Sequence, residues 1–159
     1  MSHEPTTQER AALLASLPQC HDWLLVDAVT ARGPDWLEAR WTVPEGFPAV
    51  RRTGADPPRL LPGSITLEHV VQAGELLVAQ LRGAARPEDG AHVLSRVRAA
   101  RFTGMVRPGD ALSTRVALTD RLGPAYEVRA EVRARGDVVA RLRLAYTASA
   151  AIAAVTGAT

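Results

Sequence analysis

The chain contains no lysine, a single cysteine and no long apolar run, and each of these features excludes a class of protein. Because all 19 basic residues are arginines, Schiff-base catalysis and the lysine of nucleotide-binding phosphate loops are excluded. Cys20 alone cannot build an internal disulfide framework, which is typical of a reducing compartment. Residues 145–158 are too few and too polar to span a bilayer, and no targeting segment is recognisable. We therefore expect a cytoplasmic protein with no membrane partner.

The rest of the composition argues against metal and nucleic-acid sites. The four histidines and the cysteine lack the spacing of metal ligands, and the glycines occur singly rather than in a phosphate-binding loop. The formal net charge of +2 is too small to indicate a nucleic-acid partner. With 47% hydrophobic and 23% charged residues, the 159-residue chain is expected to form one folded domain.

Hydrophobic periodicity predicts an α+β fold. The predicted helices are residues 7–17 and 64–82, and the predicted strands are residues 23–31, 36–43, 92–102, 111–121, 126–135 and 138–147. Residues 44–63 contain five prolines and three glycines, which predicts a long loop with a lid or binding role. The long second helix has one apolar stripe, so we expect an antiparallel sheet wrapped around it, with the last four strands as a meander.

Three motifs resemble the bacterial β-hydroxyacyl-acyl-carrier-protein dehydratases. Residues 17–27 (LPQCHDWLLVD) resemble the family's LP-x-R-Y-P-F-L-L-V-D, and residues 61–72 (LPGSITLEHVVQ) resemble the M-P-G-x-x-x-x-E-x-x-x-Q of its central helix. Residues 100–110 (ARFTGMVRPGD) resemble its A-R-F and V-x-P-G-D segments. The resemblance covers about residues 7–148, which we expect to form the core of a single domain, residues 1–159, with short tails. It implies the hotdog fold and a dimer with two acyl tunnels at the subunit interface.

The resemblance also implies a chemistry. Dehydratases of this family remove water from a 3-hydroxyacyl thioester that an acyl carrier protein holds on its phosphopantetheine, and they need no cofactor. A histidine takes the α-proton, a carboxylic acid helps the hydroxyl leave, and helix N-terminal amides polarise the thioester carbonyl. By this resemblance Glu68 is the catalytic acid, Gly63 and Ser64 bind the thioester oxygen, and Gln72 and Phe47 line the acyl tunnel.

The catalytic histidine of the family is missing from this chain. Residues 45–48 read EGFP where the family has G-H-F-P, so this alignment places Gly46 at the histidine position. Counting back from Pro62 places Gly54 there instead. The spacing from Pro48 to Pro62 is also longer than in the family, so residues 49–57 look like an insertion in the active-site loop. We therefore expect either a homodimer or a heterodimer in which a His-bearing dehydratase paralogue supplies the base.

Other polar residues allow functional and structural interpretations. Arg51 and Arg52 are candidates for contact with phosphopantetheine or an acidic carrier helix, and a solvated loop explains them equally well. His69 lies about 100° around the helix from Glu68, which favours a structural role. His21 is expected to be a packed polar residue and His92 to face solvent.

Three functions compete at this stage. The first is a dehydratase-like subunit in fatty-acid or polyketide biosynthesis that supplies Glu68 to a site shared with a partner. The second is a non-catalytic hotdog protein that binds or scaffolds acyl carrier proteins. The third is an acyl thioesterase that uses Glu68 to activate water.

Overall fold

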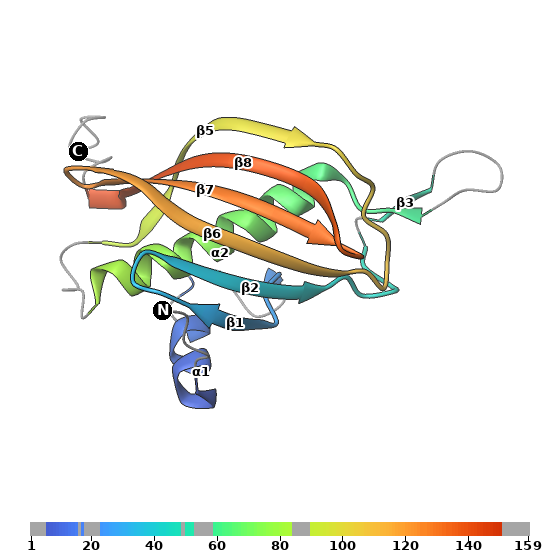
Figure 1. Cartoon of the computed structure of the whole chain (residues 1–159), viewed down its shortest axis with the longest axis horizontal. Helices are drawn as coiled ribbons and strands as arrows, with labels where there is room; N and C mark the ends of the chain where they lie inside the picture. The colour runs from blue at the N-terminus through green and yellow to red at the C-terminus, as the bar shows by residue number, and fades with distance from the viewer. Residues whose placement is uncertain are drawn as a thin grey trace.

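The predicted hotdog arrangement is confirmed by the structure, a computed structural model that describes residues 6–15, 17, 23–48, 50–52, 59–83 and 90–150. A six-stranded antiparallel sheet lies across the long helix α2 (Figure 1). The elements are α1 (Thr7–Ala15), β1 (Ala28–Arg32), β2 (Trp36–Thr42), β3 (Arg51–Arg52), β4 (Arg59–Leu60), α2 (Gly63–Arg82), β5 (His92–Phe102), β6 (Ala111–Leu122), β7 (Ala125–Ala134) and β8 (Asp137–Ala148).

The strand order β1-β2-β6-β7-β8-β5 differs from the predicted meander. Strands β6, β7 and β8 are consecutive neighbours, but β5 pairs with β8 and leaves the place beside β6 to β2. The connection after β5 explains the difference, because it is bonded to other parts of the fold. The Leu61 N–H donates to the Val106 carbonyl, and the N–H groups of Val43 and Gly109 bond to the carbonyls of Asp110 and Val43, respectively. These bonds hold the connection in place where it crosses from β5, at one edge of the sheet, to β6, which pairs with β2.

The first predicted strand is shorter than expected, because β1 begins at Ala28 rather than at Trp23. Instead of joining a strand, the backbone of Leu25 is bonded by side chains of α2. Its N–H donates to Gln72 Oε1 at 2.7 Å, and its carbonyl lies 2.6 Å from His69 Nδ1. The segment ahead of β1 is therefore fixed to the helix and not to the sheet.

The loop predicted for residues 44–63 contains a short hairpin. Strands β3 and β4 pair antiparallel, with Arg51 opposite Leu60 and Arg52 opposite Arg59. The hairpin projects at the end of the molecule where α2 begins (Figure 1). Most of the predicted insertion, residues 49–57, lies outside the described residues.

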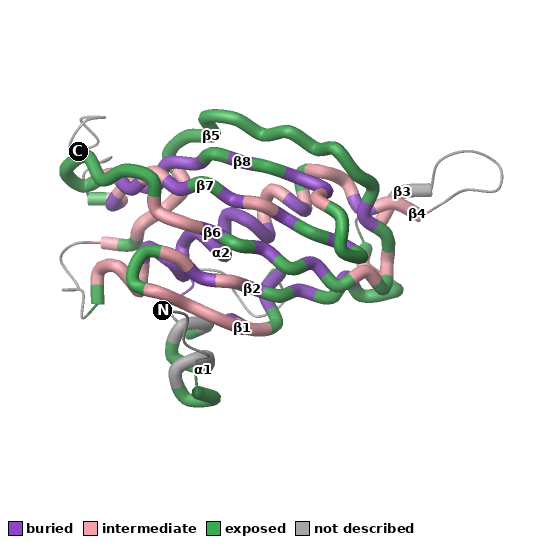
Figure 2. The backbone as a smooth tube through the Cα atoms, in the orientation of Figure 1, coloured by how far each residue is buried: buried purple, intermediate pink, exposed green. Residues whose placement is uncertain are grey.

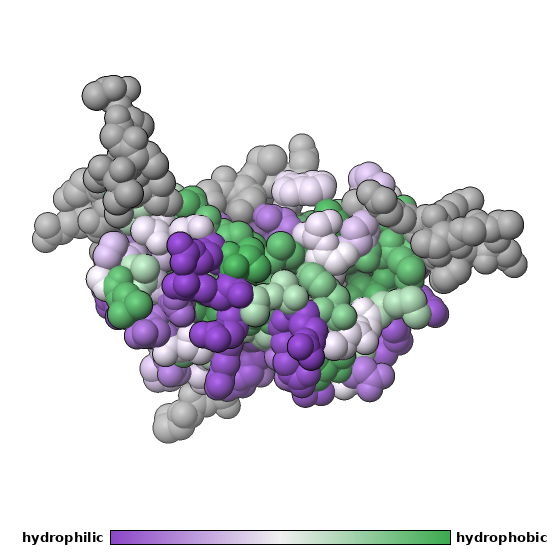
Figure 3. Space-filling model, turned by 90° about the horizontal axis from the view of Figure 1, so that it is seen from above, coloured by the Kyte–Doolittle hydropathy of each residue, from purple (hydrophilic) through white to green (hydrophobic). Residues whose placement is uncertain are grey.

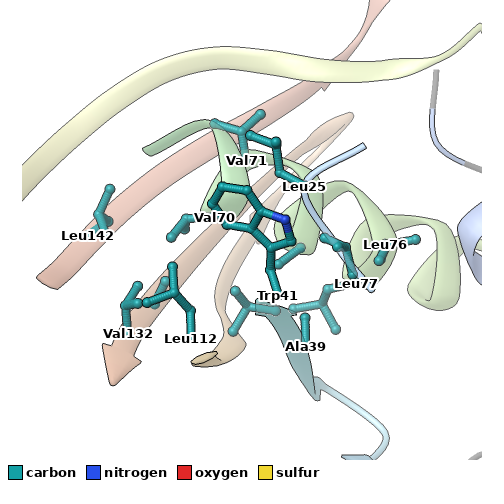
Figure 4. Close-up of a cluster of buried hydrophobic side chains, with 14 of the residues drawn as sticks. Leu25, Ala39, Trp41, Val70, Val71, Leu76, Leu77, Leu112, Val132 and Leu142 are labelled. Atoms are coloured by element: carbon teal, nitrogen blue, oxygen red, sulfur yellow. The ribbon is translucent and has the colours of Figure 1, made fainter. Parts of the chain in front are cut away.

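The core lies between α2 and the inner face of the sheet. Buried and less buried positions alternate along β7, and β8 alternates over residues 140–144, which is the period of a half-buried strand (Figure 2). Around Trp41, side chains from α2 and from several strands meet (Figure 4). The labelled members of this cluster are Leu25, Ala39, Trp41, Val70, Val71, Leu76, Leu77, Leu112, Val132 and Leu142. Its large apolar content holds α2 in a fixed place under the sheet.

Candidate active site

Helix α2 carries four polar side chains into the protein interior, those of Thr66, His69, Gln72 and Glu75. His69 and Gln72 are fully buried, Glu75 is 7% exposed, and Glu68 is partly buried. Because residues four and seven apart lie on one face of a helix, Glu68, Gln72 and Glu75 form a polar stripe. The family motif pointed to Glu68 and Gln72 but not to Glu75, for which the helical spacing was the only available signal.

Gln72 links the polar stripe of α2 by hydrogen bonds to the segment that precedes β1. Its Oε1 accepts from the Leu25 N–H, and its Nε2 donates to the Trp23 carbonyl at 2.9 Å and to Glu68 Oε1 at 3.2 Å. A buried amide with all of these partners has one orientation. Gln72 therefore positions the Glu68 carboxylate, and its predicted role as a tunnel wall stays a prediction.

His69 is a structural residue, as the sequence indicated. A carbonyl oxygen only accepts, so the contact with Leu25 assigns the ring proton to Nδ1. Nε2 then accepts from the Thr114 hydroxyl at 2.8 Å, and the ring stacks on Trp41 with 5.7 Å between centroids. Burial lowers the pKa of His69 from 6.5 to about 4, against the opposing effects of the Leu25 carbonyl and the charge of Asp27. The imidazole is therefore neutral at pH 7 and both of its nitrogens are occupied.

The low pKa of His69 predicts a loss of stability in acid. Between pH 6.5 and pH 4 the unfolded chain binds a proton at this histidine that the folded chain does not, so stability rises with pH in this window. We expect the free energy of unfolding to fall by about 3 kcal/mol from pH 7 to pH 4 through this residue. Denaturant unfolding of the wild type and of His69→Gln, whose amide does not titrate, measures this contribution. An equally steep pH dependence in both proteins would contradict it.

Tyr146 joins β8 to the polar stripe of α2. Its hydroxyl donates to the Val71 carbonyl at 2.9 Å, and a Cβ on Gly74 would lie 2.0 Å from the Tyr146 oxygen. Glycine is therefore needed at position 74 to admit the tyrosine. Burial raises the pKa of Tyr146 well above its ordinary value, and the negative charges of Glu75 and Glu68 act in the same direction. The two carboxylates thus lie close enough to act on the same buried hydroxyl.

The N-terminus of α2 lacks a side-chain cap. Its N-cap is Pro62, and the N–H groups of Ile65 and Thr66 bond back to the Pro62 carbonyl. Within the described part of the chain, the N–H groups of Gly63 and Ser64 have no acceptor. Free amides at the positive end of a helix suit a developing oxyanion.

A small apolar hollow of about 120 Å³ adjoins this helix end. Gly63, Thr66 and Phe102 are among the residues that line it. The Phe102 ring lies directly over Gly63, since a Cβ at that position would be 3.3 Å from ring atoms. The predicted oxyanion amides therefore sit beside apolar surface.

Phe47 is brought towards Gln72 by aromatic contacts. Its ring stacks on Trp23 at 5.9 Å and meets Trp41 edge-on at 5.4 Å. Because Gln72 is bonded to the Trp23 carbonyl, the predicted tunnel residues Phe47 and Gln72 share one neighbour. The sequence motifs did not single out Trp23, which is 41% exposed at this place.

Gly46, at one of the two positions aligned with the missing histidine, is exposed and has room for a side chain. A Cβ built there meets no atom within 4 Å, and its φ is not among the positive values. Gly54, the other candidate position, lies outside the described residues. So do the side chains of Arg51 and Arg52, whose backbone forms β3, and His21.

His92 does not face solvent, and that prediction is wrong. Its ring is partly buried and meets Tyr126 edge-on with 5.3 Å between centroids. His92 lies opposite Ala148 on β8.

Among the described residues, no three His, Cys, Asp or Glu side chains are grouped as metal ligands. No helix in the described ranges has the length and apolar character needed to cross a membrane.

Known proteins resemble this chain in sequence and in fold. Residues 56–143, more than half of the chain, match the FabA-like domain family. The 3-hydroxyacyl-[acyl-carrier-protein] dehydratase FabZ of Thioalkalivibrio sulfidiphilus is 33% identical over 133 residues, which cover 80% of this chain and 88% of the relative. FabZ of Acidovorax sp. is 35% identical over 132 residues, with the same coverage. The dehydratase heterocomplex ApeI:P from Xenorhabdus doucetiae has the same fold, with a TM-score of 0.72, 20% identity, and 91% and 95% of the two chains covered.

Proposed function

Because the chain belongs to the FabA-like family and is a dehydratase-like hotdog protein, we propose that it is a subunit of a 3-hydroxyacyl-acyl-carrier-protein dehydratase that supplies Glu68 as the catalytic acid. The observation that carries this proposal is the position of Glu68. It is partly buried, held by Gln72, and lies little more than one turn after the uncapped start of α2. Dehydratases of the FabZ type need no cofactor, and their substrate is carried on phosphopantetheine.

The geometry suits the elimination of water from a 3-hydroxyacyl thioester. The thioester oxygen takes the free N–H groups of Gly63 and Ser64, which stabilise the enolate as a base removes the α-proton. Glu68, as the general acid, gives a proton to the 3-hydroxyl, the carbon–oxygen bond breaks, and water and the enoyl thioester leave. The hydrogen bond from Gln72 keeps the carboxyl group in one orientation during this step.

This chain has no free imidazole for the α-proton within the described residues. Both nitrogens of His69 are bonded in the core, and His92 packs on Tyr126. In the proposed function the base comes from a second subunit, a paralogue that keeps histidine at the position that the loop alignment assigns to Gly46 in this chain. In such a heterodimer one site combines the paralogue's histidine with Glu68 of this chain.

The free edge of the sheet supports a dimer. Strand β5 lies at the edge and is exposed along most of its length (Figure 2). Its inner-face residues Val97 and Phe102 remain 42% and 45% exposed, and Met105 beyond the strand is 55% exposed. Figure 3 looks onto this edge and shows apolar surface bordered by hydrophilic side chains. An unpaired edge strand with an apolar patch favours pairing with another chain. Since Phe102 also covers Gly63, a partner at this edge would lie next to the predicted oxyanion amides.

Reconstitution tests the proposed function. The purified chain should form enoyl thioester from a 3-hydroxyacyl carrier protein only at background rate, and adding the His-bearing paralogue should restore turnover. Product analysis by mass spectrometry separates the alternatives. Release of free acid would identify a thioesterase instead, and tight binding of the acyl carrier without any turnover in the complex would identify a scaffold.

A further inference from the structure

A groove on the outer face of the sheet has no part in the proposed dehydration. Its volume is about 670 Å³, and its lining residues come from β5, β6, β7 and β8. The charged ones occupy exposed or half-exposed strand positions, on the face of the sheet away from α2, which lies behind these strands in Figure 1. Its charged lining consists of Arg101, Arg115, Arg129, Arg141, Arg143 and Glu131. Five positive charges against one negative charge make it an electropositive hollow.

Short side chains make the groove deep. Ala99 on β5 and Ala117 on β6 lie in the same row of the sheet as Arg129 and Arg143, because the strand register aligns all four. Alanines at the two sides of this row leave space that long side chains fill elsewhere on this face. The groove therefore combines arginine side chains with a largely apolar lining.

The register also places like charges directly opposite each other. Arg129 on β7 is paired with Arg143 on β8, and Arg141 on β8 is paired with Arg101 on β5. Like charges in such cross-strand pairs destabilise a sheet. Because neighbouring strands are about 5 Å apart and alternate residues about 7 Å apart, the four guanidinium groups can converge on one ligand.

Of these four arginines, only Arg141 is paired with an acidic neighbour among the described residues. Glu131 is shared by Arg133 at 2.6 Å and Arg141 at 3.1 Å. Within the described residues, Arg101, Arg129 and Arg143 form no ion pair.

Arg115, the arginine of the groove on β6, already has partners on β2. It pairs with Glu38 at 2.9 Å and lies over the Trp36 ring at 3.8 Å. The excess positive charge is therefore concentrated on β5, β7 and β8.

We propose that this groove binds an organic diphosphate. The pair Arg129 and Arg143 offers planar forked donors that match one phosphate group. Arg101 lies opposite Arg141, whose Nε is bonded to Glu131, so Arg101 and the terminal nitrogens of Arg141 are the donors for the second phosphate. A volume of about 670 Å³ exceeds what two phosphates need and is typical of small-molecule sites, so the apolar lining accepts the organic part. An anion there removes the repulsion that the two pairs impose on the empty sheet.

Calorimetric titration at physiological ionic strength tests the site, with ADP, inorganic pyrophosphate and inorganic phosphate as probes. We expect ADP and pyrophosphate to bind and phosphate to bind at least about tenfold more weakly, since one phosphate engages one arginine pair. Arg129→Gln and Arg143→Gln should each weaken ADP binding about tenfold or more. The matched control is Arg98→Gln, because Arg98 is an arginine of β5 that lies outside the groove and is paired with Glu127 at 2.6 Å. It should change ADP binding less than twofold.

Thermal unfolding provides a second, independent readout. Without anion, Arg143→Gln should raise the melting temperature by about 1–3 °C, because it relieves a like-charge pair. With saturating ADP the wild type should gain more stability than the variant. The proposal is overturned if neither ADP nor pyrophosphate binds, or if Arg98→Gln weakens binding as much as Arg129→Gln. It is also overturned if Arg129→Gln instead abolishes carrier-protein binding or changes the oligomeric state, which would assign the groove to a protein surface.

Discussion

Replacing Glu68 by glutamine should lower the turnover of the reconstituted complex by about 10²–10⁴-fold. Glutamine keeps the size of the side chain and the oxygen that accepts from Gln72 Nε2, so the local structure is retained. It cannot donate the acid proton that the 3-hydroxyl needs to leave. The initial rate of enoyl-thioester formation should therefore fall through kcat, with little change in KM.

Glu38→Gln is the matched control for this variant. Glu38 lies on β2 and pairs with Arg115 on the outer face of the sheet, away from α2. It should change turnover less than twofold. Equal turnover of the Glu68→Gln complex and the wild-type complex would remove Glu68 from the mechanism and leave carrier binding as the role of this subunit.

Installing histidine at position 46 should give the lone chain dehydratase activity. Gly46→His places an imidazole at the position that the EGFP segment aligns with the family's G-H-F-P, and the backbone there has open space and no positive φ. Two copies of the variant then contain both a base and Glu68. A positioned general base contributes about 10²–10⁴-fold, so turnover should rise above background by a factor in this range.

Two further variants distinguish a positioned base from any added imidazole. Glu45→His puts the ring one residue away, at an exposed site, and should stay at background. Gly54→His tests the other alignment of the loop. If Glu45→His gains as much activity as Gly46→His, the added imidazole acts without a defined position and the aligned site is wrong.

The architecture could be predicted from the sequence because the hydrophobic residues of its strands and central helix recur at regular spacings. Residues 126–135 alternate cleanly, and β7 falls within one residue of the predicted bounds. Helix α2 begins at Gly63, one residue before the prediction, since the proline–glycine pair marks its start. The position of Glu68 relative to this start followed from the motif alone.

Long-range polar contacts could not be predicted. Gln72 and His69 read as polar residues on a helix, and only the fold shows that they replace a strand in bonding the backbone of Leu25. The crossing from β5 to β6 depends on backbone bonds between the connection after β5 and residues 43 and 61, which have no sequence signature. The groove over β5–β8 also required the register, because like-charged arginines on different strands are opposite each other only after pairing.

The most direct test compares Gly46→His with the double variant Gly46→His/Glu68→Gln, because it needs no second protein. The quantity measured is the initial rate of enoyl-thioester formation by each purified chain. If the aligned base and Glu68 belong to one catalytic site, the rate gained by the single variant should return to background in the double variant. A double variant that keeps the full gained rate would show that Glu68 takes no part in the reaction.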